Sequence, residues 1–359
     1  MHAMKSDEQY ARCLVLAGGG FRFGYYLGVH AAAEECGRAP DVLLATCGGA
    51  IAAALIAGLP DARARREWAA SPAMYDFLGA VASTRRATPL RVIGGAARRW
   101  LARTPAPRIP DLFGEYLFDL PPVMPLPASP APGAPAVAIV GGQVLFAPAD
   151  VGKARGGRAL FAEVVFGPGR VAALLDGRPA PAADPRWSAG AVAPRLLADT
   201  ALPLQDAVRI SIADMFYFQS HACQGRHYTG GVIDLFPIEL ARALAREVIM
   251  ERKMPFNPWL AAPALRAVLG IDGAARLRHV DAQHADAWVD TRDMAQALRA
   301  HGIGKRIDWR RNRIGLAAPD SPAAYAAQVH AQWEYGYRKG MAALAGVKYA
   351  HMQSSRGKR

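Results

Sequence analysis

Two successive segments of the chain each read as an apolar strand, a glycine turn and a helix. In the first, residues 13–17 run into three glycines at 18–20 and then into a helical stretch over 24–35. In the second, residues 42–44 lead through another glycine turn into an alanine-rich helix over 50–59. Two such units in a row are typical of a parallel sheet, because the return crossover between parallel strands needs a helix. We therefore predict an α/β fold with a mostly parallel central sheet flanked by helices.

The uncharged stretch 42–60 has nearly the length of a membrane span. Its interior contains a glycine turn, and Gly58 and Pro60 close its helix. A strand, a turn and a helix that are buried on all sides explain the missing charge without lipid. We expect no transmembrane segment here.

The rest of the chain contains further strand candidates and a proline-rich connector. Apolar runs predict strands at 136–140, 144–146, 160–166, 171–175 and 208–212. Residues 121–135 form the connector.

After Pro237 the pattern predicts helices to the end, with basic amphipathic stretches at 239–253 and 323–344. We expect three parts: a disordered tail or tag remnant over 1–10, an α/β domain over 11–240, and a basic helical extension over 241–359 packed on or beside that domain.

The charge balance of the 359 residues favours an anionic partner. Lys and Arg number 43 against 30 Asp and Glu, which gives a formal net charge of +13. No basic run is interleaved with aromatic residues that would stack on bases, so we expect no nucleic acid. Four cysteines make no disulfide framework in a chain of this length, which favours a reducing compartment. We expect a cytoplasmic protein that makes peripheral contact with an anionic membrane; the sequence does not indicate its oligomeric state.

The first glycine turn is not a nucleotide-binding motif. A dinucleotide fingerprint needs a third glycine, which would fall on Phe23, and an acidic residue at the end of the next strand, where Ala45 and Thr46 stand. A phosphate-binding P-loop is excluded as well, because no Gly-Lys-Ser/Thr follows.

An oxyanion hole beside a nucleophile elbow explains the two turns better. A sharp strand-to-helix turn exposes one side chain between small neighbours, and Cys47 occupies that point before Gly48 and Gly49. Backbone N–H groups of Gly19 and Gly20, in the adjacent parallel loop, would then donate to the oxyanion of a tetrahedral intermediate.

Three short motifs follow one another in the chain: Gly18-Gly19-Gly20-Phe21-Arg22-Phe23, with Gly28-Val29 later in its helix; Ala45-Thr46-Cys47-Gly48-Gly49; and Thr229-Gly230-Gly231, preceded by residues 207–216. In order and spacing they resemble the G-G-G-x-R-G, G-x-S-x-G and D-G-G motifs of the patatin-like phospholipases. The resemblance covers residues 11–240 and implies a three-layer α/β fold, lipid or fatty-acyl ester substrates and no cofactor. It also implies that Gly18, Gly19 and Gly20 form the oxyanion hole.

The departures from the family pattern fall on the catalytic positions. The resemblance places the family's nucleophilic serine at Cys47 and its basic aspartate at Thr229, and we expect these two residues to face each other. A cysteine can attack an acyl group, but a threonine hydroxyl has no useful basicity at neutral pH. Ala45 and Phe23 replace two further glycines of the pattern.

Other residues near these motifs are candidates for a catalytic role. His227, His221 and Asp234 flank the Thr229 turn and would supply a base, although side chains at loop ends are more often solvated. Arg22 would anchor the glycine loop or contact a lipid phosphate. We identify no metal ligands.

Two functions remain open at this point. In the first, the chain is a patatin-like acyl hydrolase scaffold that is weakly active or silent and binds acyl lipid. In the second, Cys47 serves an active thiol-based hydrolase or transferase on lipid esters or thioesters. The joint loss of serine and aspartate favours the first.

Overall fold

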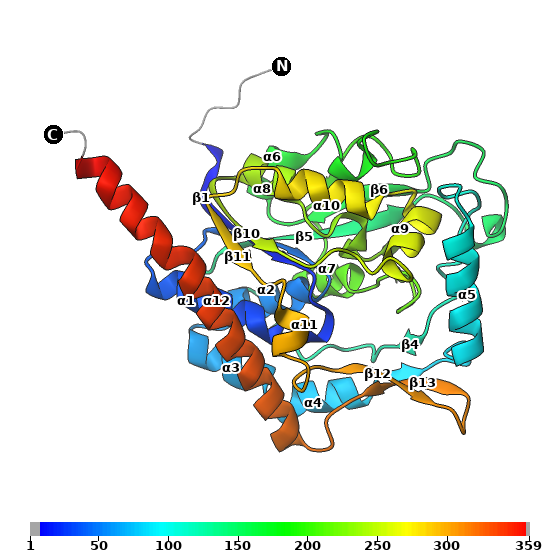
Figure 1. The fold of residues 1–359 in the computed structure, drawn as a ribbon. Helices are drawn as coiled ribbons and strands as arrows, with labels where there is room; N and C mark the ends of the chain where they lie inside the picture. The colour runs from blue at the N-terminus through cyan, green and yellow to red at the C-terminus, as the bar shows by residue number, and fades with distance from the viewer. Residues whose placement is uncertain (1–7, 357–359) are drawn as a thin grey trace.

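A nine-stranded sheet forms the centre of the molecule in the computed structural model, which describes residues 8–356 (Figure 1). Along the sheet lie β11 (Ala287–Asp290), β10 (Ala245–Arg252), β1 (Tyr10–Ala17), β2 (Val42–Thr46), β5 (Ala136–Val144), β6 (Phe161–Phe166) and β7 (Leu197–Asp199). The hairpin of β8 (His221–Cys223) and β9 (Arg226–Thr229) joins β5 through β9. Every neighbouring pair from β11 to β5 is parallel, which confirms the predicted sheet.

Helices cover both faces of the sheet, so the fold has three layers. One face packs against α1 (Gly24–Glu35), α2 (Gly48–Gly58), α7 (Leu204–Ser211) and α12 (Pro322–Arg356). The other packs against α6 (Gly169–Leu175), α8 (Ile238–Leu244), α9 (Ala261–Leu269) and α10 (Gly273–Asp281). Side chains of β1 alternate between the two cores: Leu14 and Leu16 enter the first, and Cys13 and Val15 enter the second.

Smaller elements surround this sandwich. They are α3 (Ala62–Ala69), α4 (Pro72–Gly79), α5 (Pro89–Leu101), α11 (Met294–Ala297), the paired strands β3 (Ala82–Ser83) and β4 (Phe118–Asp119), and the hairpin β12 (Gly304–Asp308) and β13 (Arg313–Ala317). Helix α5 stands beside α9 at one end of the molecule (Figure 1). Single 3-10 turns lie at Gly20–Arg22, Pro148–Asp150, Pro181–Ala183 and Gly231–Asp234. The proline-rich connector 121–135 contains neither helix nor strand.

Two predicted strands are wrong, because both segments are helical. The predicted strand over 144–146 is wrong as well, because β5 runs unbroken from Ala136 to Val144 and ends there. Residues 208–212 fall on α7 and its C-cap, and residues 171–175 fall in α6. The sequence Val-Arg-Ile-Ser-Ile alternates apolar and polar residues, as a strand with one buried face does. The buried residues of α7, however, include Ala207 and Ile210, and also Val208 and Ser211, each pair three positions apart as one face of a helix requires.

The prediction of helices throughout the region after Pro237 is also wrong. Strand β10 pairs with β1 on one side and with the edge strand β11 on the other, so the sheet continues across the boundary predicted at residue 240. Val248, Ile249 and Met250 are all buried, as in any strand covered on both faces, and such an unbroken apolar run does not alternate. Residues 1–7 of the predicted tail lie outside the described residues, whereas Tyr10 already opens β1.

No helix within the described part of the chain has both the length and the apolar character needed to cross a lipid bilayer. The uncharged stretch 42–60 contains β2 and α2, both of which are buried in the three-layer core.

Candidate active site

Cys47 occupies the sharp turn between β2 and α2. Its backbone has φ 48° and ψ −124°, which is a strained conformation for a residue with a side chain. The Cys47 N–H donates to Ser211 Oγ at 2.9 Å, and the Ser211 hydroxyl donates to the Val140 carbonyl at 2.7 Å. Through these bonds α7 and β5 hold the turn in place, and the turn presents the thiol as a nucleophile elbow does.

The glycine loop after β1 lies directly against this elbow. A Cβ atom on Gly48 would come within 2.2 Å of the Gly20 carbonyl oxygen, so only a glycine at position 48 allows the two loops to touch. The Gly18 N–H donates to the carbonyls of Leu16 and Thr46. Within the described residues the N–H groups of Gly19 and Gly20 have no such partner, so these two remain able to donate to an oxyanion.

The thiol hydrogen-bonds with a carboxylate that the sequence analysis did not identify. Cys47 Sγ lies 3.0 Å from Asp214 Oδ1; Cys47 is buried and Asp214 is partly buried. Burial raises the pKa of Asp214 to about 7, although hydrogen bonds from the Cys47 thiol and the Val232 amide oppose the rise. Burial, followed by the charge of Asp214, raises the pKa of the Cys47 thiol well above its usual value. Near neutral pH the pair therefore holds a protonated thiol beside a carboxylate that can accept its proton.

The Gly230-Gly231 turn makes room for this pair. A Cβ atom on Gly230 would lie 2.2 Å from Asp214 Oδ1, and one on Gly231 would lie 2.9 Å from the Cys47 nitrogen. Glycine at both positions therefore lets the loop that carries Asp214 and the elbow approach each other.

Thr229, which the motif resemblance aligned with an aspartate, is buried, and its hydroxyl donates to the Ala213 carbonyl at 3.4 Å. The contact joins β9 to the residue that precedes Asp214. Among the described residues Thr229 makes no hydrogen bond with Cys47.

A polar cluster places the cation Lys253 beside the buried carboxylate of Glu251. Glu251 accepts hydrogen bonds from Tyr25, Tyr26 and Thr291, and Lys253 lies 3.4 Å from the same carboxylate. The charge of Lys253 lowers the pKa of Cys47, against the larger effects of burial and Asp214. Lys253 lies in the segment predicted to be a basic helix, so the sequence pattern did not connect it with the site.

The other candidate residues lie apart from the thiol. The ring of His227 packs edge-on against Phe113, with centroids 4.9 Å apart, and His221 lies near Asp206 and Cys223. Asp234 forms a buried ion pair with Arg276 at 3.1 Å. Arg22 follows the glycine loop, and its guanidinium lies against Gly302. In the described structure none of the four hydrogen-bonds with Cys47.

A cavity of about 770 Å³ opens beside Asp214, between the segment 214–217 and helices α5 and α9. Its walls are largely apolar and include Leu235, Leu260 and Leu265. Positive side chains also line it: Arg86, Arg91, Arg98, Arg99 and Lys305. The volume is typical of a site for a small organic molecule, and apolar walls with a few charges suit an amphiphile.

A comparison with protein-family models matches residues 14–242 to the patatin-like phospholipases. A comparison with curated proteins finds no match. The matched segment covers most of the 359 residues and contains the glycine loop, the elbow, Asp214 and the Thr-Gly-Gly turn. Together with the three-layer α/β fold, this match shows that the chain belongs to the patatin-like phospholipase family.

Proposed function

We propose that the protein hydrolyses lipid acyl esters with Cys47 as nucleophile and Asp214 as general base. The observation that carries this proposal is the 3.0 Å contact between Cys47 Sγ and Asp214 Oδ1 at the strained elbow. A base must lie within hydrogen-bonding reach of the proton it removes, and Asp214 does. This function is the thiol-based hydrolase expected as the second possibility from the sequence. Asp214 serves as the base, a role that the Thr229 hydroxyl cannot fill.

The reaction proceeds in two steps. In the first, Sγ attacks the ester carbonyl while Asp214 takes the thiol proton, and the N–H groups of Gly19 and Gly20 stabilise the oxyanion. The carbon–oxygen bond then breaks, and protonated Asp214 returns the proton to the leaving alkoxide. In the second step Asp214 takes a proton from water, the resulting hydroxide attacks the thioester, and the proton is transferred to the departing thiolate.

The raised pKa of Cys47 decides how the thiol is activated. Burial and Asp214 both disfavour a preformed thiolate. Proton transfer must therefore accompany attack, as it does for a serine, and the raised pKa of Asp214 suits that task near neutral pH.

The cavity suggests the substrate class. Its apolar walls suit an acyl chain, and Arg91, Arg98 and Lys305 suit an anionic headgroup. We infer acyl esters of anionic lipids as substrates.

The raised pKa of Cys47 also favours a second candidate function. If the thiol never loses its proton, the same cavity retains acyl lipid without turnover, and the protein is a silent member of its family.

Hydrolysis of nitrophenyl esters and matching thioesters separates the two functions. We expect turnover by the wild type and a loss of about 10²- to 10⁴-fold in Cys47→Ala and Asp214→Asn, which remove nucleophile and base. Cys36→Ala changes another buried cysteine and serves as the control. A wild type no faster than Cys47→Ala, but still holding fatty acid, would support the silent function instead.

A further inference from the structure

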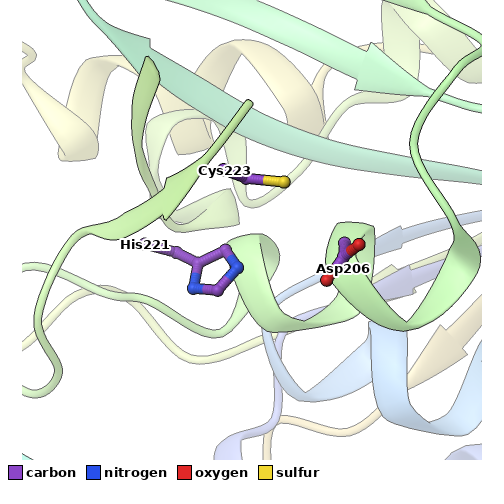
Figure 2. A group of neighbouring side chains, drawn as sticks. All are labelled: Asp206, His221 and Cys223. Carbon is purple, nitrogen blue, oxygen red and sulfur yellow. The ribbon is translucent and has the colours of Figure 1, made fainter. Parts of the chain in front are cut away.

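Asp206, His221 and Cys223 bring three different donor groups together away from the elbow. One ligand atom from each side chain lies within 4.8 Å of the others, and all three residues are partly buried. Figure 2 shows the three side chains near one another, with His221 and Cys223 on one strand and Asp206 on the neighbouring helix. His221 and Cys223 are two positions apart on β8 and therefore share a face.

Apart from a hydrogen bond between Cys223 and the Gln224 backbone, none of the three side chains makes a hydrogen bond or an ion pair in the described structure. Their combination of thiolate sulfur, imidazole nitrogen and carboxylate oxygen is the donor set of zinc sites. In a tetrahedral zinc site neighbouring ligand atoms lie roughly 3.5 Å apart, so small rotations of the side chains would close the group around an ion. We propose that Asp206, His221 and Cys223 bind a zinc ion, with water or a further ligand at the fourth position.

The charges around the group suit a divalent cation. A cysteine thiolate and a carboxylate neutralise Zn²⁺, and Asp199 is a further negative charge that acts on Cys223. Arg209 is the opposing positive charge, and it acts on His221.

The position of the group gives the ion a structural role. Helix α7 carries Asp206 in its first turn, ends at Ser211 and is followed by Asp214. Strand β8 packs against α7 and continues through β9 to the Thr229 turn. An ion that joins β8 to α7 therefore braces both segments that hold Asp214 against Cys47, so zinc acts as a stabiliser of the site and takes no part in the reaction.

Cobalt substitution tests this site in the full-length protein. We expect one Co²⁺ per chain, with a thiolate-to-cobalt charge-transfer band that disappears in Cys223→Ser. His221→Ala and Asp206→Asn should each weaken Co²⁺ and Zn²⁺ binding by about tenfold or more. Cys36→Ala and His284→Ala change a cysteine and an exposed histidine outside the group and should bind as the wild type does.

Hydrogen exchange tests the site in the wild-type protein, so it does not require any variant to fold. In the wild type, zinc should slow amide exchange in β8 and in the first turn of α7, because the ion joins the two. Absence of the cobalt band, a band that persists in Cys223→Ser, or unchanged exchange in β8 with zinc would each overturn the proposal.

Discussion

At the residue scale, the chemistry of the site depends on which atom holds one proton. Burial raises the pKa of Cys47 and of Asp214 alike. The charge of Asp214 raises the pKa of Cys47 further, whereas the hydrogen bond from the Cys47 thiol lowers that of Asp214. The thiol keeps the proton because its pKa rises from a higher starting value. Asp214 is then the group that gains the proton when a bond to sulfur forms.

The first prediction concerns Cys47→Ser. If Asp214 is the base, this variant has a serine and an aspartate in contact and should react with a serine-directed fluorophosphonate, because a positioned carboxylate activates the hydroxyl. Labelling should disappear in the double variant Cys47→Ser/Asp214→Asn and persist in Cys47→Ser/Thr229→Val. Equal labelling of Cys47→Ser and Cys47→Ser/Asp214→Asn would show that the carboxylate is not the base.

The second prediction concerns pH. A base with a pKa of about 7 must be ionised to act, so kcat/KM should rise with pH through about 7 and reach a plateau above it. Below that pKa the rate should fall about tenfold per pH unit, as the fraction of ionised Asp214 falls. A profile that stays flat between pH 6 and 8 for an ester of constant charge would contradict the role of Asp214.

The elbow could be predicted from the sequence, and its base could not. Cys47 stands among small residues in a strand-turn-helix segment, a local pattern that survives the change from serine. Asp214 is 167 residues away from Cys47 and reaches it only through tertiary structure. The available signal was its place within residues 207–216, the stretch that precedes the third glycine turn in the family pattern.

At the element scale, one buried ion cluster joins three elements beside the site. Arg276 of α10 pairs with Asp234 in the turn after Gly230 and with Glu239 of α8, at 3.1 and 2.6 Å. The cluster fixes the end of the Thr-Gly-Gly turn to the helical layer that contains α8 and α10. Asp234 therefore has a structural role, and no catalytic role is needed to explain it.

The third prediction follows from this cluster. Arg276→Met should lower the free energy of unfolding by about 3–5 kcal/mol, because it leaves two carboxylates without their buried partner. Arg278→Met, on an exposed position of the same helix, is the matched control and should change stability little. Urea denaturation of the two variants measures the difference; equal midpoints would show that the cluster contributes no net stability.

Elements were predictable where local pattern and tertiary position agree. Strands β1 and β2 end at glycine turns, and helices α1 and α2 begin at or shortly after the same turns. Helix α7 was missed because its apolar spacing also satisfies a strand, and β10 because burial on both faces removes the alternation that marks a strand. In both cases the deciding contacts come from distant parts of the chain.

At the scale of the whole molecule, positive charge gathers where the cavity opens. Helix α5 exposes Leu90, Ile93 and Trp100 beside Arg91 and Arg98. Apolar and cationic side chains together are typical of surfaces that meet anionic lipid.

The fourth prediction is salt-dependent binding to anionic vesicles. Wild-type protein should sediment with phosphatidylglycerol vesicles at low salt, bind neutral phosphatidylcholine vesicles less, and dissociate as salt shortens the screening length to about 10 Å or less. Arg91→Glu/Arg98→Glu should weaken binding more than Arg246→Glu/Arg278→Glu, an equal charge change outside the cavity lining. Equal losses in both pairs would assign binding to net charge alone, and equal retention on neutral vesicles would remove the electrostatic basis.

Mass spectrometry of protein quenched in acid while it reacts with an acyl ester tests the roles of Cys47 and Asp214 directly. Acyl transfer through Cys47 predicts an adduct of acyl mass on the peptide that contains Cys47, removable by hydroxylamine as a thioester is. In Asp214→Asn the adduct should form at least about 100-fold more slowly, because the base is gone. An ester that is turned over without an adduct on Cys47, an adduct that forms equally fast in Asp214→Asn, or no reaction at all would contradict the proposed pair.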